Sequence, residues 1–235
     1  MTATAMRERR LRVRRLGLVP YEAAYRVQKE TEREVRARAA PDTLLLVEHP
    51  HVLTLGRRAD ESAVHATPAL LAERGVAVVE TDRGGKATYH GLGQVVGYPV
   101  VNLSPEREDV HRYVRDLEET IVRALADFGV GAFPLKGLTG VYTARGKIAA
   151  IGIHIARWVT THGFALNVNT DLSYFNLILA CEGEPVTSMA ELLGRDTPLA
   201  EVEDRLVARF AEVFGAEVEE AGVPPAEAAG AATPV

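Results

Sequence analysis

The chain of 235 residues contains one thiol, Cys181. A thiolate is a strong nucleophile, and a nearby cation or helix N-terminus lowers the pKa of a cysteine. Thr187 and Ser188 are residue types that cap helices, and they predict a short helix running to Leu193 just after the cysteine. A lone cysteine more often serves as a small buried apolar residue, so spacing alone leaves both interpretations open.

A second candidate for chemistry is the glycine-rich segment at residues 82–93. The adjacent glycines Gly84 and Gly85 allow backbone amides to approach a ligand closely. Arg83 would hold an acidic group, and His90 would donate or accept a proton. The alternative is a glycine-rich turn between strands with a structural histidine, and the spacing alone favours that alternative.

Lys147 begins an otherwise apolar segment that runs to His154. A lysine at the lip of an apolar strand is partly desolvated, so that neighbouring groups feel its charge strongly. The small residues Ala150 and Gly152 leave room for a ligand or for a closely packed helix. The alternative is a lysine that caps a hairpin in water, with His154 and His162 as satisfied core or rim histidines.

Hydrophobic periodicity predicts the elements that must position these residues. Strands are expected at residues 11–19, 43–47, 52–55, 76–80, 94–101, 140–142, 147–157 and 162–168, with turns at 145–146 and 159–161. Helices are expected at 21–39, 68–74, 109–128 and 199–214, with a short helical segment at 171–179. The order is not a regular strand–helix alternation, so we expect an α+β fold with a mixed, largely antiparallel sheet flanked by helices. Residues 9–216 form one catalytic domain in this interpretation, and the Ala-, Pro- and Gly-rich residues 217–235 are expected to be a disordered tail.

Composition narrows the class of protein. Hydrophobic residues make up 47% of the chain and charged residues 25%, as in ordinary globular proteins. No apolar run of bilayer length and no secretory signal are present, so we expect a cytoplasmic protein without a membrane span. One cysteine cannot form an internal disulfide, and the seven histidines lack metal-ligand spacing, so no metal is expected.

Charge is distributed unevenly along a chain of net charge −5. Residues 7–15 carry six arginines and one glutamate. This segment is either a docking patch for an acidic partner or a solvated edge strand, and the edge strand is the simpler interpretation. The rest of the chain is acidic and lacks a nucleic-acid motif, so no nucleic-acid partner is expected.

Four blocks of sequence, taken together, resemble the lipoyl(octanoyl) transferase family. Arg83-Gly-Gly-Lys-Ala-Thr-Tyr-His-Gly-Leu-Gly-Gln94 with Tyr98-Pro99 resembles the motif RGG-x-x-T-Y-H-G-P-G-Q. Thr139-Gly-Val141 with Lys147-Ile148 and Ile151-Gly152 resembles the next block, and His162-Gly-Phe-Ala-Leu-Asn-Val168 matches HGxALNV. Cys181 falls where that family carries its nucleophile. The chain departs from the pattern at Leu92, where the family has proline, and at Ala180 and Glu182, where Pro-Cys-Gly is usual.

The resemblance implies a fold, a reaction and a set of site residues. The fold would be like that of the catalytic domains of biotin and lipoate ligases. Cys181 would attack the thioester of octanoyl-acyl carrier protein, and Lys147 would stabilise the thiolate. The octanoyl group would then pass to a lysine of an apo lipoyl domain, in a 2-oxo-acid dehydrogenase or the glycine cleavage H protein, without a cofactor. The implied substrate-binding residues are Arg83, Gly84, Gly85, Lys86, Ala87, Thr88, Tyr89, His90, Ala150, Ile151, Gly152, Gly163, Phe164 and Ala165.

Two alternatives to this function remain open at the level of sequence. One is an ATP-dependent lipoate or biotin protein ligase, which activates a free acid as an adenylate and needs no cysteine. The other is a non-catalytic relative that only binds lipoyl domains or acyl chains.

Overall fold

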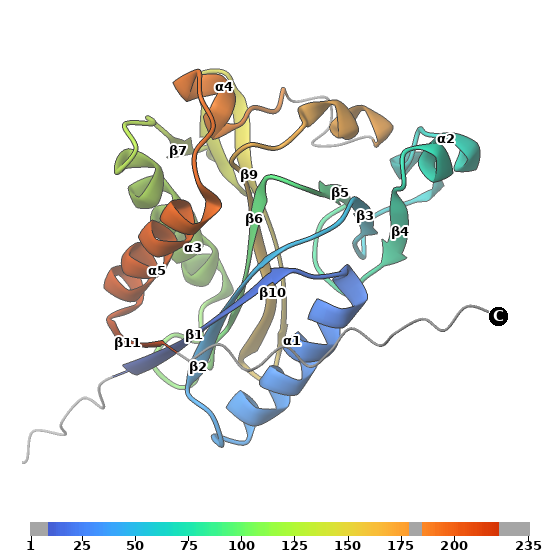
Figure 1. The fold of residues 1–235 in the computed structure, drawn as a ribbon. Helices are drawn as coiled ribbons and strands as arrows, with labels where there is room; N and C mark the ends of the chain where they lie inside the picture. The colour runs from blue at the N-terminus through green and yellow to red at the C-terminus, as the bar shows by residue number, and fades with distance from the viewer. Residues whose placement is uncertain (1–8, 179–184, 221–235) are drawn as a thin grey trace, which may run out of the picture.

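The computed structural model describes residues 9–178 and 185–220 (Figure 1). The strands are β1 (Arg9–Leu18), β2 (Asp42–Glu48), β3 (Val52–Leu55), β4 (Ala77–Glu80), β5 (Ala87–His90), β6 (Gln94–Val100), β7 (Phe133–Pro134), β8 (Val141–Thr143), β9 (Gly146–Ala156), β10 (Val159–Asn167) and β11 (Ala216–Glu220). The α-helices are α1 (Tyr21–Arg36), α2 (Pro68–Glu73), α3 (Val110–Ala126), α4 (Met189–Leu193) and α5 (Leu199–Phe214). Two 3₁₀ segments are η1 (Glu61–Ala63) and η2 (Leu172–Leu177).

A mixed sheet of eight strands forms the centre of the fold, in the order β11-β1-β2-β6-β10-β9-β8-β7. β1 runs parallel to both β2 and β11, whereas the pairs from β2 to β7 are antiparallel. The expected α+β class with a largely antiparallel sheet is therefore confirmed.

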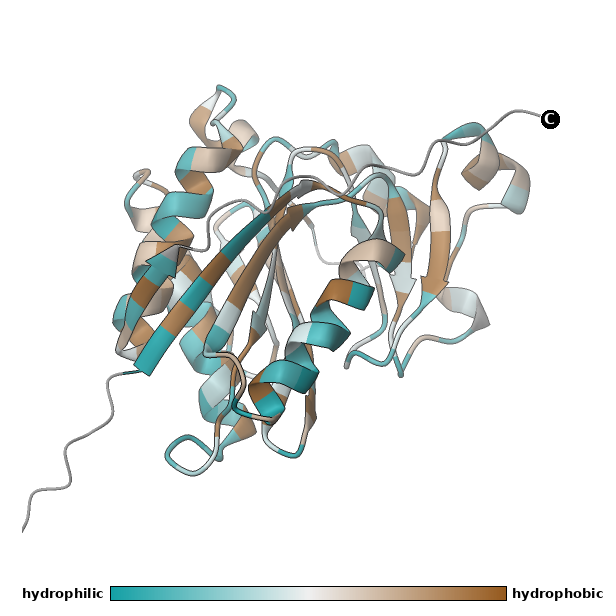
Figure 2. Ribbon diagram, turned by 60° about the horizontal axis from the view of Figure 1, so that its bottom comes forward, coloured by the Kyte–Doolittle hydropathy of each residue, from teal (hydrophilic) through white to brown (hydrophobic). Residues whose placement is uncertain are grey.

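Helices cover both faces of this sheet (Figure 1). α3 and α5 pack together on one face around a core that includes Leu117, Ile121 and Phe210, and α1 packs on the other face through Tyr21 and Ala24. In Figure 2 the strands are coloured largely as hydrophobic (brown), and the outer sides of the helices as hydrophilic (teal). This is expected for amphipathic helices, each of which buries its apolar face against the sheet.

A second, three-stranded sheet in the order β4-β3-β5 lies beside the first. β3 is parallel to β4 and antiparallel to β5, with Thr54 opposite Thr88. No strand was expected within the glycine-rich segment at residues 82–93, whereas β5 forms there. This sheet holds the segment from Asp82 to Lys86 against the large sheet, because the amide of Gly84 donates to the carbonyl of Ile153 on β9 at 2.9 Å.

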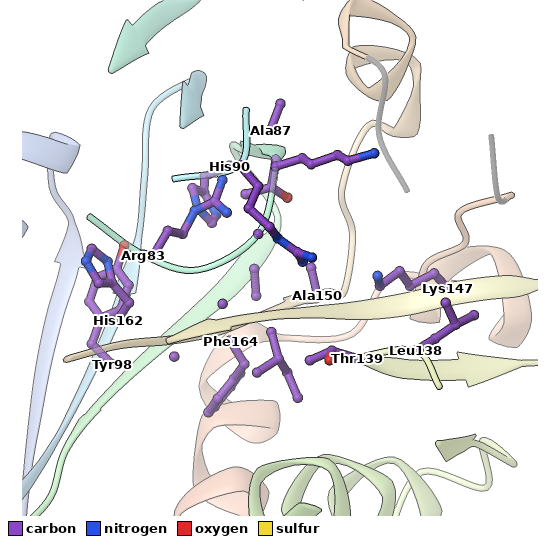
Figure 3. A pocket seen from close by; sticks show the side chains of 18 of the residues that line it. Arg83, Ala87, His90, Tyr98, Leu138, Thr139, Lys147, Ala150, His162 and Phe164 are labelled. Atoms are coloured by element: carbon purple, nitrogen blue, oxygen red, sulfur yellow. The ribbon is translucent and has the colours of Figure 1, made fainter. Parts of the chain in front are cut away.

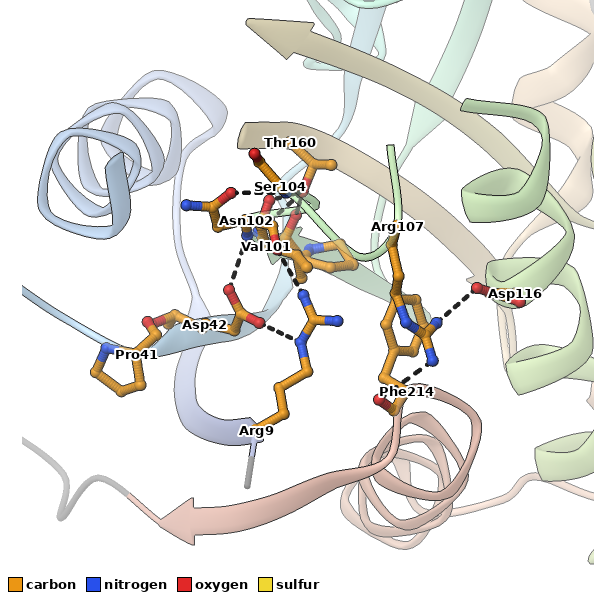
Figure 4. Close-up of polar contacts among 12 residues, drawn as sticks. Arg9, Pro41, Asp42, Val101, Asn102, Ser104, Arg107, Asp116, Thr160 and Phe214 are labelled. Atoms are coloured by element: carbon orange, nitrogen blue, oxygen red, sulfur yellow. Dashed lines mark hydrogen bonds and ion pairs between the residues drawn. The ribbon is translucent and has the colours of Figure 1, made fainter. Parts of the chain in front are cut away.

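A polar cluster ties the ends of β1, β2 and β6 together (Figure 4). Asp42 accepts hydrogen bonds from Arg9 Nε at 2.5 Å and from the amide of Asn102 at 2.7 Å. Close by, Arg107 donates to Asp116 at 2.8 Å and to the carbonyl of Phe214 at 3.3 Å. These contacts join the arginine-rich first strand to the sheet. The segment is a strand as expected, but it is not an edge strand, because β11 pairs with β1 on the side opposite β2.

The structure corrects two expected boundaries. The domain does not end at residue 216, because residues 216–220 form β11, which pairs with β1; only residues 221–235 of the expected tail lie outside the described residues. The turn expected at residues 159–161 lies instead at Arg157 and Trp158, whose φ angles are +51° and +62°. Val159 and the two threonines after it are good strand formers, and they begin β10.

Candidate active site

A cavity of about 440 Å³ lies between β9 and β10 on one side and the segment from Arg83 to His90 on the other (Figure 3). Its volume is in the usual range of small-molecule sites. Of the residues expected from the sequence, Arg83, Gly85, Lys86, Ala87, Thr88, His90, Lys147, Ala150, Ile151, Gly152, Gly163, Phe164 and Ala165 line it. The structure thus brings together three blocks that are far apart in the chain.

The floor of the cavity depends on two glycines that face each other across the β9–β10 pair. A Cβ on Gly152 would lie 3.0 Å from the carbonyl oxygen of Gly84. A Cβ on Gly163 would lie 2.2 Å from the carbonyl oxygen of Gly97, closer than any real Cβ contact. Only glycine fits at position 163, and at position 152 a Cβ would require the Gly84 carbonyl to move, so the floor of the cavity is backbone and small side chains.

Gly84 and Tyr89 were expected to contact substrate, and neither lines the cavity. Side chains alternate across a strand, so Thr88 and His90 face the cavity while Tyr89 points to the opposite side of β5. There Tyr89 packs in a second apolar cluster with Phe175 and shares a hydrogen bond of 2.8 Å with Nδ1 of His51.

Arg83 is buried, with 7% of its surface exposed. Its Nε and Nη2 donate to Thr54, and its Nη1 donates to the carbonyl of Gly84 at 3.0 Å. Burial lowers the pKa of Arg83 to about 10, which leaves it charged at neutral pH. These contacts show that the guanidinium ties the glycine-rich segment to β3, in addition to lining the cavity.

His90 begins a buried chain of hydrogen bonds. Its Nδ1 lies 2.8 Å from Oε1 of Gln94, whose Nε2 donates to Oδ1 of Asn167 at 2.9 Å. Nδ2 of Asn167 then donates to the carbonyl of Thr187 at 3.0 Å. In this arrangement Nδ1 of His90 carries the hydrogen. Burial, and then the neighbouring His49, lower the pKa of His90 to about 3, so that it is neutral.

Lys147 lies at the mouth of the cavity, half-buried, with Nζ 5.3 Å from the centre of the Tyr142 ring. Its amide donates to the carbonyl of Pro185 at 2.8 Å, and its carbonyl accepts from the amide of Thr187 at 2.9 Å. Gly140 makes room for the side chain, because a Cβ there would lie 2.7 Å from Cε of Lys147. The expected position at the lip of an apolar strand is therefore confirmed.

Cys181 lies outside the described residues. The chain is described up to Ile178, which pairs with Val64, and again from Pro185. The expected cap after the cysteine is confirmed, since the Ser188 hydroxyl accepts from the amide of Glu191 at the start of α4.

Several lining residues were not expected from the sequence: Tyr21, Arg58, Tyr98, Gly137, Leu138, Thr139, Tyr142 and His162. His162 has φ of +57° within β10, a rare conformation for a non-glycine residue. Its amide is held by Gln28, and its Nε2 donates to Oδ1 of Asp82 at 2.6 Å. Burial lowers the pKa of His162, whereas the hydrogen bond from His162 holds the pKa of Asp82 well below its usual range. The pair is therefore a neutral imidazole donating to a carboxylate.

Two classes of feature are missing from the part of the chain that the structure describes. No group of three or more His, Cys, Asp or Glu side chains is arranged to hold a metal ion among those residues. Within the same residues, no helix has the length and apolar character needed to span a bilayer.

Comparison with known proteins identifies the family. The model of the lipoyl protein ligase A/B catalytic domain matches residues 20–211. The chain is 50% identical over 214 residues to an octanoyltransferase of Chloroflexus aurantiacus, covering 89% of this chain and 96% of that one. It is 47% identical over 207 residues to an octanoyltransferase of Solibacter usitatus, covering 88% and 94% of the two chains.

Solved structures agree on the fold. A putative lipoate protein ligase of Thermoplasma acidophilum with bound lipoic acid superimposes with a TM-score of 0.71 at 20% identity, covering 92% of this chain and 90% of that one. A lipoate-protein ligase A bound with ATP gives 0.70 at 19% identity, with the same coverage. The chain belongs to the lipoyl protein ligase A/B catalytic domain family and, within it, to the octanoyltransferases, which are acyltransferases.

Proposed function

We propose that this enzyme transfers an octanoyl group from octanoyl-acyl carrier protein to a lysine of an apo lipoyl domain, through an acyl-thioester on Cys181. The observation that carries the proposal is the backbone pairing of Lys147 with residues 185–187, at the mouth of an apolar-floored cavity. Cys181 precedes Pro185 by four residues, so the chain alone keeps it within about 14 Å of this pairing.

The reaction has two steps with the same cysteine. In the first step, the Cys181 thiolate attacks the carbonyl carbon of the donor thioester, and the carrier thiolate leaves. In the second, the acceptor amine attacks the octanoyl-cysteine, an amide forms, and the cysteine thiolate is released. Lys147 enters the first step as an ammonium and gives its proton to the departing carrier thiolate. The neutral amine that results takes the proton of the acceptor amine in the second step, which restores the ammonium beside the Cys181 thiolate. A covalent intermediate suits two large protein substrates, because the donor can depart before the acceptor arrives.

Lys147 would also favour the thiolate. A free cysteine has a pKa of ~8.5, so only about a tenth is ionised near pH 7.5. An ammonium group nearby stabilises the anion, and more strongly where water is partly excluded. Glu182, next to the cysteine in sequence, acts in the opposite direction, so the lysine has more to offset in this chain.

The cavity suits an alkyl chain. Ala150, Gly152, Gly163 and Ala165 contribute backbone and methyl groups to its floor. The Phe164 ring, which alternates with Gly163 and Ala165 along β10, packs in the core under α3 and α5. Burial of an alkyl chain is worth about 0.8 kcal/mol per CH₂, so eight carbons supply several kcal/mol of binding without a charged contact. A thioester is already activated, and the reaction needs no nucleotide.

The test is the mass of the intact protein after incubation with octanoyl-acyl carrier protein. We expect an adduct of one octanoyl group that hydroxylamine removes, and its absence in Cys181→Ala with the melting temperature retained. Transfer to a lipoyl domain should proceed without ATP and magnesium. Activity that requires both, with free octanoate as the better substrate, would place the chain with the ATP-dependent ligases whose fold it shares. Tight binding of the donor without any adduct would instead indicate a non-catalytic binder.

A further inference from the structure

A buried carboxylate on α3 lies close to Lys147 but outside the cavity. Glu118 belongs to the buried face of this helix, among apolar residues such as Leu117 and Ile121, and only 6% of its surface is exposed. A glutamate is almost never buried to this extent unless a partner compensates its charge. Glu118 is not one of the residues that line the cavity, so any part that it plays in the reaction must pass through another residue.

The hydrogen-bond partner of this carboxylate is the turn that packs against Lys147. Oε1 of Glu118 accepts from the amide of Gly140 at 3.1 Å. Gly140 has φ of +126°, and a Cβ at this position would lie 2.7 Å from Cε and 3.4 Å from Nζ of Lys147. Gly140 therefore touches both side chains, because its amide binds the carboxylate while its Cα packs against the lysine. In Figure 3 the preceding residues Leu138 and Thr139 lie at the same end of the cavity as Lys147.

Charge also connects Glu118 with Lys147. The contacts through Gly140 place the carboxylate and the lysine amine at most about 10 Å apart. Charges that are partly shielded from water still interact over such a distance. Burial raises the pKa of Glu118, whereas the Gly140 amide and the cations Arg115 and Lys147 lower it. Those two cations, one on α3 itself and one on β9, are the charged groups that face Glu118.

We propose that Glu118 is a positioning residue for Lys147, which holds the Gly140 turn against the lysine side chain and keeps the lysine amine protonated. This inference rests on the proposed function, in which the Lys147 ammonium stabilises the Cys181 thiolate and gives its proton to the departing carrier. An acyl chain in the cavity removes water from around the ammonium and so disfavours its charge. A fixed carboxylate nearby offsets part of that loss.

The coupling is measured on the lysine amine itself, independently of octanoyl transfer. Lysine labelled with carbon-13 at the ε position gives one NMR signal for each of the four lysines, Lys29, Lys86, Lys136 and Lys147. The signal that is absent from Lys147→Met identifies Lys147. Glu118→Gln keeps an oxygen for the Gly140 amide but removes the charge, so the titration midpoint of the Lys147 amine should fall by on the order of half a pH unit or more.

Glu119→Gln is the matched control, because it removes a half-exposed charge one residue along the same helix. It should leave the titration midpoint of the Lys147 amine within about 0.1 pH unit of the wild-type value, since solvent screens an exposed charge. A Glu118 that only fastens the turn predicts a wild-type midpoint in Glu118→Gln as well. Equal midpoints in Glu118→Gln and wild type therefore overturn the inference.

The pH dependence of acylation extends the test to activity. The single-turnover rate of Cys181 acylation by octanoyl-acyl carrier protein should fall at high pH, as the Lys147 amine loses its proton. In Glu118→Gln this fall should begin at a pH lower by the same interval as the NMR midpoint, and a wild-type profile contradicts the inference. Glu118→Leu also removes the acceptor of the Gly140 amide, so it should lower the rate at least five-fold at every pH; if it does not fold, Glu118→Gln decides. No acylation of the wild-type protein refutes the proposed function, whereas the NMR midpoints still decide whether Glu118 acts on Lys147.

Discussion

Replacement of Asn167 by aspartate should couple the stability of the site to pH. Asn167 is 4% exposed, accepts from Gln94 and donates to the carbonyl of Thr187. An ionised aspartate keeps the first hydrogen bond but faces the Thr187 carbonyl with a second acceptor. A protonated aspartate restores the donor. Burial therefore raises the pKa of the new carboxyl in the folded state.

The size of the effect follows from linkage. With an unfolded pKa of ~3.9 and a folded pKa raised by about 3 units, Asn167→Asp loses about 0.5 kcal/mol of unfolding free energy at pH 4 and about 4 kcal/mol at pH 7. The folded pKa is the higher one, so stability is fully present below about pH 4 and is lost as pH rises towards the folded value. At pH 7 the melting temperature should fall by about 8–16 °C.

Urea unfolding at several pH values, together with initial rates of octanoyl transfer, checks this prediction. Thr187 pairs with the backbone of Lys147, so displacement of its carbonyl should lower transfer at pH 7 by on the order of ten- to a hundred-fold. Asn169→Asp is the matched control. Asn169 donates to the carbonyl of Thr197 at 2.8 Å in the same way, but it is only half-buried and outside the cavity. Its stability should depend less on pH, and its transfer rate should equal that of wild type. The same pH profile for both variants would refute the reasoning.

Further predictions concern single residues. Lys147→Met should raise the pKa of the Cys181 thiol and slow its alkylation by iodoacetamide at neutral pH more than at high pH; identical pH profiles would show that the two residues do not interact. Ala150→Leu fills the middle of the cavity and should lower kcat/KM for octanoyl at least ten-fold but for butanoyl less, whereas equal losses would indicate general misfolding. Gly140→Ala places a methyl group against the Lys147 side chain at a φ of +126°. It should lower the free energy of unfolding by about 1–3 kcal/mol and slow octanoyl transfer. Urea unfolding that shows wild-type stability would contradict the expected clash. The hydrogen bond from His162 depresses the pKa of Asp82, so the Asp82 carboxylate stabilises the fold above its unfolded pKa, and this contribution is lost as pH falls. Asp82→Asn should therefore make the free energy of unfolding fall less steeply between neutral and acidic pH. The same fall as in wild type would argue against the Asp82–His162 pair.

The long amphipathic elements were predictable, and so were short elements with a clear apolar run or cap, such as β3 and α4, whereas β5 and β7 were not. α3 and α5 repeat apolar residues over four turns, which fixes both their type and their buried face. β5 and β7 have four and two residues, too few for a periodic signal. Residues 217–220 of β11 were assigned to the disordered tail because they lead into an Ala-, Pro- and Gly-rich segment. Their partner strand β1 lies about two hundred residues away in sequence. Such pairing depends on tertiary structure.

The site was predictable where one segment of chain contributes several residues. The blocks around Arg83 and Gly152 were assigned to the site through the resemblance of four sequence blocks, since spacing alone favoured a glycine-rich turn, and both line the cavity. Tyr21 and His162 were missed as lining residues, because their positions depend on how α1 packs against β10 and on a positive φ that no local residue type signals. Tyr89 was wrongly assigned to the cavity because a motif names consecutive residues, while a strand sends alternate side chains to opposite sides.

The outermost strands of the large sheet bear on how partner proteins reach this enzyme. Among the described strands, β7 is only two residues long and includes a proline, and β11 carries the acidic residues Glu217 and Glu219. Short, proline-containing or like-charged edges disfavour the addition of a further strand. Recognition of a carrier or acceptor by β-augmentation is thereby disfavoured, as is self-association edge to edge. Selectivity between partner proteins should then lie in the side chains around the mouth, such as Arg58 and Leu138, and could be re-engineered there without disturbing the sheet.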